Sequence, residues 1–288
     1  MKMPKITIVT PSYNQGRYLE QTILSVLGQQ YPNLEYIIID GGSTDNSVEI
    51  IKRYADKLAY WESGPDAGQS SAINKGLRRA KGSIVCWLNS DDVLLPGALN
   101  EVGQSFADNH RIDVVTGYTI RTDEKLRLVH NHYTPVQVNW LAKRGVLYYS
   151  QQSTFWKHRL MDQVGYLDEN LHGCMDGDLW IRFQLANVRI FHTRKYLAVW
   201  RLHQSCKSWV DKERWKAELS EMKSKYETKN FRDVVPWALM CYRIWKVFNG
   251  DYAKDLLFRL MWHGKPLEKF VATKFGINHW PSQFPNSL

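Results

Sequence analysis

Short apolar runs alternate with amphipathic stretches over the first hundred residues of the chain. Apolar, β-branched runs predict strands over residues 6–10, 36–39, 58–62 and 83–88. Between them, apolar side chains recur every three or four residues and predict helices over residues 17–29, from an N-cap within 43–46 to residue 53, and over 70–80. This alternation indicates βαβ units and a parallel sheet. Because the strands are apolar throughout, we expect helices on both faces of the sheet.

The remaining residues predict a less regular series of elements. Strands are expected over residues 113–119, 153–156 and 189–191, and helices over residues 97–108, 158–164 and 177–186. Residues 120–150 are mixed and show no clear period. After a domain boundary that we place near residue 210, the pattern predicts helices over residues 212–229, 236–248 and 252–262.

Composition is typical of a soluble globular protein. The 288 residues are 44% hydrophobic and 23% charged. No stretch is long and apolar enough for a membrane span, and the N-terminus lacks the apolar run of a signal peptide, so a cytoplasmic protein is expected. The four cysteines are far apart in the sequence, which favours free thiols over a disulfide framework or a zinc site.

Positive charge is concentrated near the C-terminus. Residues 1–206 hold 23 Lys and Arg against 20 Asp and Glu, whereas residues 207–288 hold 15 against 9. Within residues 236–262, Trp and Leu side chains are interleaved with Arg243, Lys246, Lys254 and Arg259. This pattern predicts a peripheral contact with an anionic membrane, and the alternative is packing on the rest of the protein or a dimer contact.

Three polar clusters follow predicted strands, at Pro11–Asn14, Asp40–Ser43 and Asn89–Asp92. In an open parallel sheet the carboxyl ends of the strands form the ligand site, so the clusters are expected to converge. Asp91 and Asp92 are adjacent like charges at the end of a buried strand, where they could cap a helix or bind a metal ion. The chain has no glycine-rich phosphate-binding motif, and a divalent cation held by an aspartate could bind a diphosphate instead.

Three stretches together resemble the family 2 glycosyltransferases with a GT-A fold: ITIVTPSYNQGRYLEQTILSVLGQQYPNLEYIIIDGGSTDNS, GPDAGQSSAINKGLRRAKGSIVCWLNSDDVLLPGAL and MDGDLWIRF. The resemblance covers roughly residues 4–206. It implies an α/β fold, with a Rossmann-like, mostly parallel sheet flanked by helices and followed by a helical C-terminal extension. The implied catalytic domain is 1–206, with a nucleotide-sugar half over 1–100 and an acceptor half over 101–206. Residues 207–288 form a basic, aromatic helical region.

The resemblance also implies a donor site. Asp40 matches the aspartate that accepts a hydrogen bond from the nucleotide base, and Asp66 lies in the stretch that closes over the nucleotide. Thr10, Pro11 and Tyr13 line the same pocket. Asn89, Ser90 and Asp91 occupy the position of the family's Asp-x-Asp motif, and Asp92 follows them as a further donor-binding residue. Because Asn89 replaces the first acid, it can bond a ribose hydroxyl but carries no charge.

The metal ligands and the catalytic base follow from the same resemblance. Asp91 matches the aspartate that binds Mn²⁺ or Mg²⁺, and His203 matches a histidine that completes the metal or diphosphate site in some relatives. Met175-Asp176 matches a Glu-Asp pair whose Asp is the base, so Asp176 is the candidate here and Asp178 is interpreted as a helix cap. Gln152, Ser153 and Trp180 are assigned to the acceptor side by position only.

The predicted activity is transfer of a hexosyl or related group from a nucleotide sugar to a glycan or lipid-linked glycan, inverting and metal-dependent. UDP-sugars are favoured because Asp40 would accept the imide N–H of uracil. The expected setting is cell-surface polysaccharide synthesis, such as lipopolysaccharide, in the cytoplasm or on the inner face of the cytoplasmic membrane. Alternatives are a sugar-nucleotide nucleotidyltransferase and a non-enzymatic carbohydrate-binding module. Nucleic acid is not an expected partner, because clustered acids repel phosphate in the absence of a metal.

Overall fold

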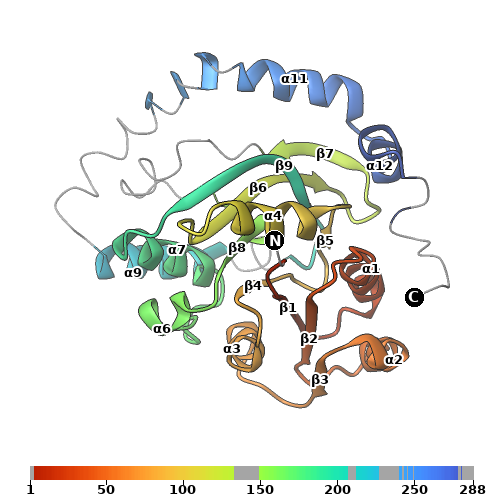
Figure 1. Ribbon diagram of the computed structural model, residues 1–288, viewed down its shortest axis with the longest axis vertical. Coiled ribbons are helices and arrows are strands. Elements are labelled where there is room, and N and C mark those ends of the chain that lie inside the picture. The colour runs from red at the N-terminus through yellow and green to blue at the C-terminus, as the bar shows by residue number, and fades with distance from the viewer. Residues whose placement is uncertain are drawn as a thin grey trace.

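A nine-stranded sheet with helices on both faces forms the body of the protein (Figure 1). The computed structural model describes residues 3–132, 149–206, 212–226, 240–241, 243–244, 246–248, 250–277 and 280. The sheet order is β3-β2-β1-β4-β8-β6-β9-β5, and β7 pairs with β6. The strands are β1 (Ile6–Ser12), β2 (Leu34–Asp40), β3 (Tyr60–Ser63), β4 (Ile84–Trp87), β5 (Val93–Leu94), β6 (Val114–Thr122), β7 (Leu128–His132), β8 (Thr154–Lys157) and β9 (Ile190–Arg201).

The parallel half of the sheet is built from β1 to β4. Successive residues of β1 and β2 point to opposite faces, and both faces are apolar: Ile8 and Ile38 enter one core, whereas Val9 and Ile39 enter the other. The first core is covered by α1 (Gly16–Leu27), α2 (Ser47–Arg53) and α4 (Ala98–Asp108), and the second by α3 (Gln69–Arg79), α6 (Leu160–Val164) and α7 (Met175–Leu185). This arrangement confirms the predicted α/β fold class and explains why the strands lack polar alternation.

The second half of the sheet is mixed. Strand β8 runs antiparallel to both β4 and β6, while β6 and β9 are parallel. The sequence predicted a strand only over residues 189–191, but β9 continues to Arg201. His192 and Thr193 are buried in it, and these polar residues interrupt the apolar pattern that prediction depends on. The pairing of β5 with β9 was also missed, because two residues are too few to show a period.

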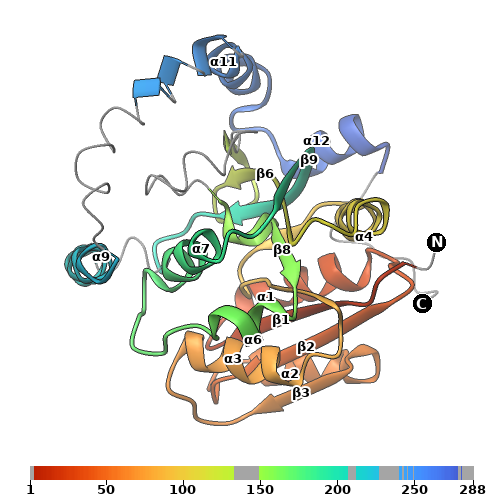
Figure 2. The same ribbon diagram turned by 60° about the vertical axis from the view of Figure 1, so that its left-hand side comes forward.

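Helices follow the sheet toward the C-terminus (Figure 2). Helix α9 (Lys212–Lys225) lies beside α7, and α11 (Asp251–Trp262) and α12 (Leu267–Phe275) pack through Phe258 and Phe270 onto Leu128 and Val199. The predicted helix over 236–248 lies partly outside the described residues, and its described part is helical. No helix among the described residues is long and apolar enough to cross a membrane.

The loops after β1 and β2 are joined by one carboxylate. Asp45 Oδ2 accepts the Gly16 N–H at 2.9 Å and Oδ1 accepts the Ser47 N–H at 2.9 Å. One side chain therefore bonds the first amide of α1 and the first amide of α2, groups without partners inside their helices. Burial would raise the pKa of Asp45, but hydrogen bonds from Ser47 and Gly16 outweigh it and hold the pKa below its usual range.

Asp45→Ala should lower the free energy of unfolding by about 1–2 kcal/mol, the usual cost of a lost helix cap counted for two helices. Because the pKa of Asp45 is lowered in the folded protein, its stabilisation is complete above the usual carboxylate range. It is lost as the pH falls below about 4, so the wild type and the variant should converge there. Urea unfolding measures both effects, and Asp56→Ala, at an exposed aspartate nearby, is the control. Equal loss in the two variants would contradict the capping role.

Candidate active site

Four loops meet at the carboxyl edge of the sheet. Strands β1, β2 and β4 are parallel, so Tyr13, Asp40 and Asn89 follow ends that lie side by side. Strand β9 also ends at this edge, because the Arg201 N–H donates to Asp92 Oδ1 at 3.0 Å. The structure therefore brings together the clusters that the sequence placed at separate strand ends.

Asp40 is buried at the end of β2 and accepts four hydrogen bonds. Its Oδ2 receives the N–H groups of Gly42 (3.1 Å) and Ser43 (2.9 Å) and the hydroxyl of Ser63 (2.7 Å), while Oδ1 receives the Ser43 hydroxyl at 2.6 Å. A carboxylate has about four lone-pair sites, and those on Oδ1 are the less used. Oδ1 can therefore accept one further donor without loss of the bonds that fix the side chain.

The other predicted pocket residues surround Asp40 unequally. Thr10 and Pro11 are buried, and the Thr10 hydroxyl lies 3.1 Å from the Tyr36 hydroxyl. The Tyr13 side chain, in contrast, is 62% exposed. Tyr13 is thus the member of this group whose ring is open to stacking by a ligand, while Thr10 and Pro11 shape the strand beneath it.

A chain of contacts leads from Asp40 to the β4 cluster. The carboxylate of Asp66 packs on Gly41, where an added Cβ would lie 2.9 Å from Asp66 Oδ2. Asp66 Oδ1 also accepts the N–H of Gly68 at 2.7 Å, and Gly68 adopts a φ of +111° that glycine tolerates. This turn places Gln69 at the start of α3, where its side-chain amide donates to Asn89 Oδ1 at 2.8 Å.

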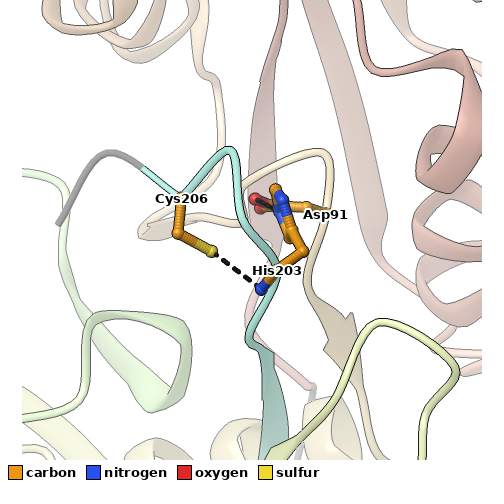
Figure 3. A group of neighbouring side chains, drawn as sticks. All are labelled: Asp91, His203 and Cys206. Atoms are coloured by element: carbon orange, nitrogen blue, oxygen red, sulfur yellow. Dashed lines mark hydrogen bonds and ion pairs between the residues drawn. The ribbon is translucent and has the colours of Figure 1, made fainter. Parts of the chain in front are cut away.

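Asp91 and His203 form the centre of the site (Figure 3). His203 Nε2 lies 2.9 Å from Asp91 Oδ2, and with Cys206 the three ligand-type atoms lie within 4.8 Å of one another. The Asp91 side chain is 19% exposed and that of His203 only 1%, so the carboxylate is the part open to a ligand. The Tyr18 ring, 4.8 Å from the imidazole, covers His203.

Two of the three side chains suit Mn²⁺. Carboxylate oxygen binds both Mn²⁺ and Mg²⁺, and imidazole nitrogen binds Mn²⁺ more readily than Mg²⁺, but a thiol must first lose its proton to ligate. Burial raises the pKa of Cys206 to about 11, and its sulfur lies 3.4 Å from both the Arg201 carbonyl oxygen and the His203 nitrogen. Asp91 and His203 therefore fit the cation implied by the resemblance, whereas Cys206 holds the loop.

Asp92 points away from Asp91 into the protein. Its Oδ2 accepts the Gln152 side-chain amide at 2.9 Å, and its Oδ1 accepts the Arg201 backbone amide. Burial, and then the charge of Asp91, raise the pKa of Asp92 well above its usual range. The buried Arg201 guanidinium lies over the Tyr18 ring and donates to Gln21 at 2.7 Å. Asp92 thus joins β4, β9 and the short helix η2 (Gln151–Ser153). In the same loop, the buried carbonyl of Ser90 accepts the Thr22 hydroxyl.

Asp176 is the second residue of α7 and remains partly exposed. Its Oδ1 accepts the Gly177 N–H at 2.7 Å. Burial raises the pKa of Asp176, although the N–H groups of Gly177 and of Asp176 itself oppose the rise. The preceding Met175 receives the Ser70 hydroxyl at 2.8 Å, so the start of α3 lies between Asp176 and Asn89.

Asp178 has a different environment from Asp176. It is buried, and it accepts Arg182 Nε at 2.8 Å, the Tyr226 hydroxyl at 2.7 Å and Lys225 Nζ at 3.3 Å. These partners use its oxygens and leave it inside the contact between α7 and α9. The structure therefore favours a structural role for Asp178.

The three residues assigned to the acceptor side lie in the interior. Gln152 bonds Asp92, and the Ser153 hydroxyl accepts from Thr119 and donates to the Gly117 carbonyl, both at 2.9 Å. Trp180 stacks on Trp87 at a centroid separation of 6.0 Å and an interplanar angle of 8°. An acceptor would reach these side chains only if their covering moved, so their contribution here is to support the site.

Sequence reasoning did not single out three residues of this network. Gln69 lies inside the second quoted stretch, three residues after Asp66, and Arg201 lies two residues before His203, so their positions were a signal that could have drawn attention to them. Glu218 carried no such signal. It belongs to a highly charged helix, yet it is buried and bonds the backbone just before α7.

Comparison with known proteins identifies the same fold and the same family as the sequence resemblance. Residues 7–188 match the family model described as Glycosyl transferase family 2. An uncharacterized glycosyltransferase of Haemophilus influenzae is 40% identical over 39% of this chain, and the match spans 46% of that relative's length.

Solved structures add two similar folds. Staphylococcus aureus TarS in complex with UDP-GlcNAc is 19% identical, with a TM-score of 0.59 over 76% of this chain and 66% of its own. Mannosyltransferase PcManGT from Pyrobaculum calidifontis, in complex with GDP-Man and Mn²⁺, is 18% identical, with a TM-score of 0.60 over 83% of this chain and 73% of its own. At this identity the likeness shows a shared GT-A fold.

Proposed function

The chain belongs to glycosyl transferase family 2, and from this premise we propose that it moves a hexosyl or related group from a UDP-sugar to a glycan or lipid-linked glycan. The protein is a glycosyltransferase, which decides against the nucleotidyltransferase and the binding module. The observation that carries the proposal is the Asp91–His203 pair at the carboxyl edge of the sheet, the edge at which Asp40 also lies. Cell-surface polysaccharide synthesis is the setting that we propose.

Recognition of the donor base is assigned to Asp40. Its Oδ1 keeps acceptor capacity, and an imide N–H of uracil or thymine supplies a matching donor that cytosine lacks. The exposed Tyr13 ring offers a stacking surface beside it. Guanine also offers an N–H donor, but its bicyclic ring requires more room, so UDP is favoured. The GDP-Man complex belongs to PcManGT and is a result for that protein.

Asp91 and His203 would hold Mn²⁺ or Mg²⁺. When bound, the cation neutralises negative charge on the leaving diphosphate. Asn89 adds no charge; its Oδ1 accepts from Gln69 and its Nδ2 lies 3.5 Å from Asp92 Oδ2, which leaves one N–H of the amide for a ribose hydroxyl. Asp92 and Arg201 keep the strand ends together beneath this layer.

Asp176 is assigned the role of general base in an inverting transfer. Its carboxylate takes the proton of the acceptor hydroxyl while that oxygen attacks the anomeric carbon. The bond between the anomeric carbon and the diphosphate oxygen breaks, and its electron pair leaves with the nucleotide. The raised pKa of Asp176 suits this role, because a stronger base accepts the proton more readily.

The metal assignment predicts different effects for neighbouring ligand-type residues. Asp91→Ala and His203→Ala should each weaken Mn²⁺-dependent UDP binding by 10-fold or more, on the order seen when metal sites are disrupted. Cys206→Ala should stay within a few-fold of wild type, because its thiol bonds the backbone. Isothermal titration of UDP with Mn²⁺ or EDTA measures these affinities. Unchanged binding in EDTA, or in both alanine variants, would refute the assignment.

The base assignment predicts a change in turnover and in its pH dependence. Asp176→Asn should reduce turnover of the donor by about 10²-fold or more, while UDP affinity stays within a few-fold. Because the pKa of Asp176 is raised, the acidic limb of kcat in the wild type should lie above the ordinary carboxylate range of about pH 4. Activity is then lost as the pH falls through that raised pKa. Donor hydrolysis against pH tests this, and a loss of UDP binding with normal turnover per bound donor would assign Asp176 to the donor site instead.

We also propose peripheral attachment to an anionic membrane through α11. Helix α11 docks on the protein by Phe258, but its opposite face exposes a row of apolar side chains: Tyr252, Leu256, Leu257, Leu260 and Met261. Met240, Ile244, Val247 and Phe248 in the preceding helical residues are exposed as well. Figure 1 shows both segments along one outer edge of the molecule.

Charge favours a lipid surface as the occupant of this face. Residues 240–262 hold four basic residues and two acidic ones. At 100° per residue, Lys254 and Arg259 lie at the two margins of the apolar row on α11. Both side chains are half-exposed and pair with acidic residues of the same helix, Lys254 with Asp251 and Arg259 with Asp255. A helix of this kind lies in the membrane interface. A lipid-linked acceptor would be presented at the same surface.

Leu260→Glu should weaken binding to phosphatidylglycerol vesicles by about 10-fold or more, since burying a leucine contributes roughly 1.5–3 kcal/mol. Leu185→Glu is the matched control, because Leu185 on α7 is 63% exposed, comparable with 74% for Leu260. Co-sedimentation at low and high salt measures binding, and phosphatidylcholine vesicles should bind less. If neither variant changes sedimentation, or if Leu260→Glu only dissociates a dimer, the membrane proposal fails.

A further inference from the structure

Glu218 of α9 binds the backbone that leads into α7. Its Oε1 accepts the N–H of His172 at 2.9 Å, and its Oε2 accepts the N–H groups of Gly173 at 2.7 Å and Cys174 at 3.2 Å. Three successive amides thus converge on one buried carboxylate, an arrangement that favours negative charge. Glu218 lies outside the region that matches the family, residues 7–188.

The surrounding contacts leave Glu218 little freedom. Arg214 donates to its Oε1 at 3.1 Å from the previous turn of α9. Trp215 packs against Gly173, where an added Cβ would lie 2.9 Å from the indole Cδ1. Met222 joins Cys174 and Ile181 in a small apolar cluster between α9 and α7. The carboxylate is therefore held on the three amides by packing on both sides.

These three amides border the proposed base. Cys174 is two residues before Asp176, and His172 lies across from Gly68, where an added Cβ would be 3.7 Å from His172 Cε1. The same short segment therefore lies against the turn before α3 and leads directly into α7. Its position fixes where α7 begins, and with it the backbone that carries Asp176.

We infer that Glu218 is a positioning residue for Asp176. The inference rests on the proposed role of Asp176 as base. Without the carboxylate, three adjacent amides lose their acceptor and the first turn of α7 can shift. Displacement of a reacting group by about 1 Å can cost on the order of 10²-fold in rate. Glutamine cannot replace the function, because its NH₂ group would face N–H donors.

The test is a double-mutant cycle on donor turnover in the full chain. Glu218→Gln should lower kcat by on the order of 10-fold, with the KM for the UDP-sugar within about twofold of wild type. In an Asp176→Asn background the same substitution should change kcat by less than about twofold, because residues that act as a unit are not additive. Equal losses in the two backgrounds would overturn the inference, as would an unchanged kcat or a loss confined to KM.

Tyr226→Phe supplies the control for loosened packing. It removes the 2.7 Å bond to Asp178 from the residue that follows α9, without touching residues 172–174. We expect Tyr226→Phe to lower the unfolding temperature about as much as Glu218→Gln does. Its kcat should stay at the wild-type value. If Tyr226→Phe lowers kcat as much, Glu218 acts only by holding α9 in place and the inference is wrong. If Asp176→Asn alone leaves kcat unchanged, the assignment of the base fails, and that result is distinct from a failure of Glu218.

Discussion

The contact between the ends of β4 and β9 is the constraint on which the site depends. Two adjacent aspartates at the end of a buried strand repel each other, and each needs compensation. Asp91 obtains it from His203, and Asp92 from Gln152 and the Arg201 amide. All three partners come from residues more than fifty positions further along the chain. These contacts tie the second half of the sheet to the first, and they leave one carboxylate facing solvent and one facing inward.

The parallel half of the fold could be predicted because its signal is local. Strands covered on both faces are apolar at every position, as in residues 36–39, and short helices between them leave few other topologies. The continuation of strand β9 beyond Phe191 escaped prediction because buried His192 and Thr193 interrupt its pattern, and burial of polar groups is decided by partners distant in sequence. The same limit applies to the site. Motifs at strand ends were enough to propose Asp40 and Asp91 for the site, whereas nothing local marks Glu218 as buried.

Rigid support is the feature shared by the proposed ligand-binding residues. Asp40 is fixed by four hydrogen bonds before any base binds, and Asn89 is oriented by Gln69. Because these bonds already restrict the side chains in the free protein, ligand binding loses less side-chain conformational entropy. The residues that the sequence assigned to the acceptor side, Gln152, Ser153 and Trp180, belong to this supporting layer in the structure.

The C-terminal helices meet the rest of the protein at two separate places, and they have different consequences. Helix α9 reaches the loop before Asp176, so it supports the residue to which the proposed base chemistry is assigned. Helices α11 and α12 pack on β7 and β9, at the far side of the sheet from α2 and α3 (Figure 2). If the apolar face of α11 lies on a membrane, the β7 edge of the sheet is the part nearest the membrane. The half of the sheet that carries Asp40 then extends into the aqueous phase. A water-soluble nucleotide sugar and a lipid-linked acceptor would then approach from opposite directions.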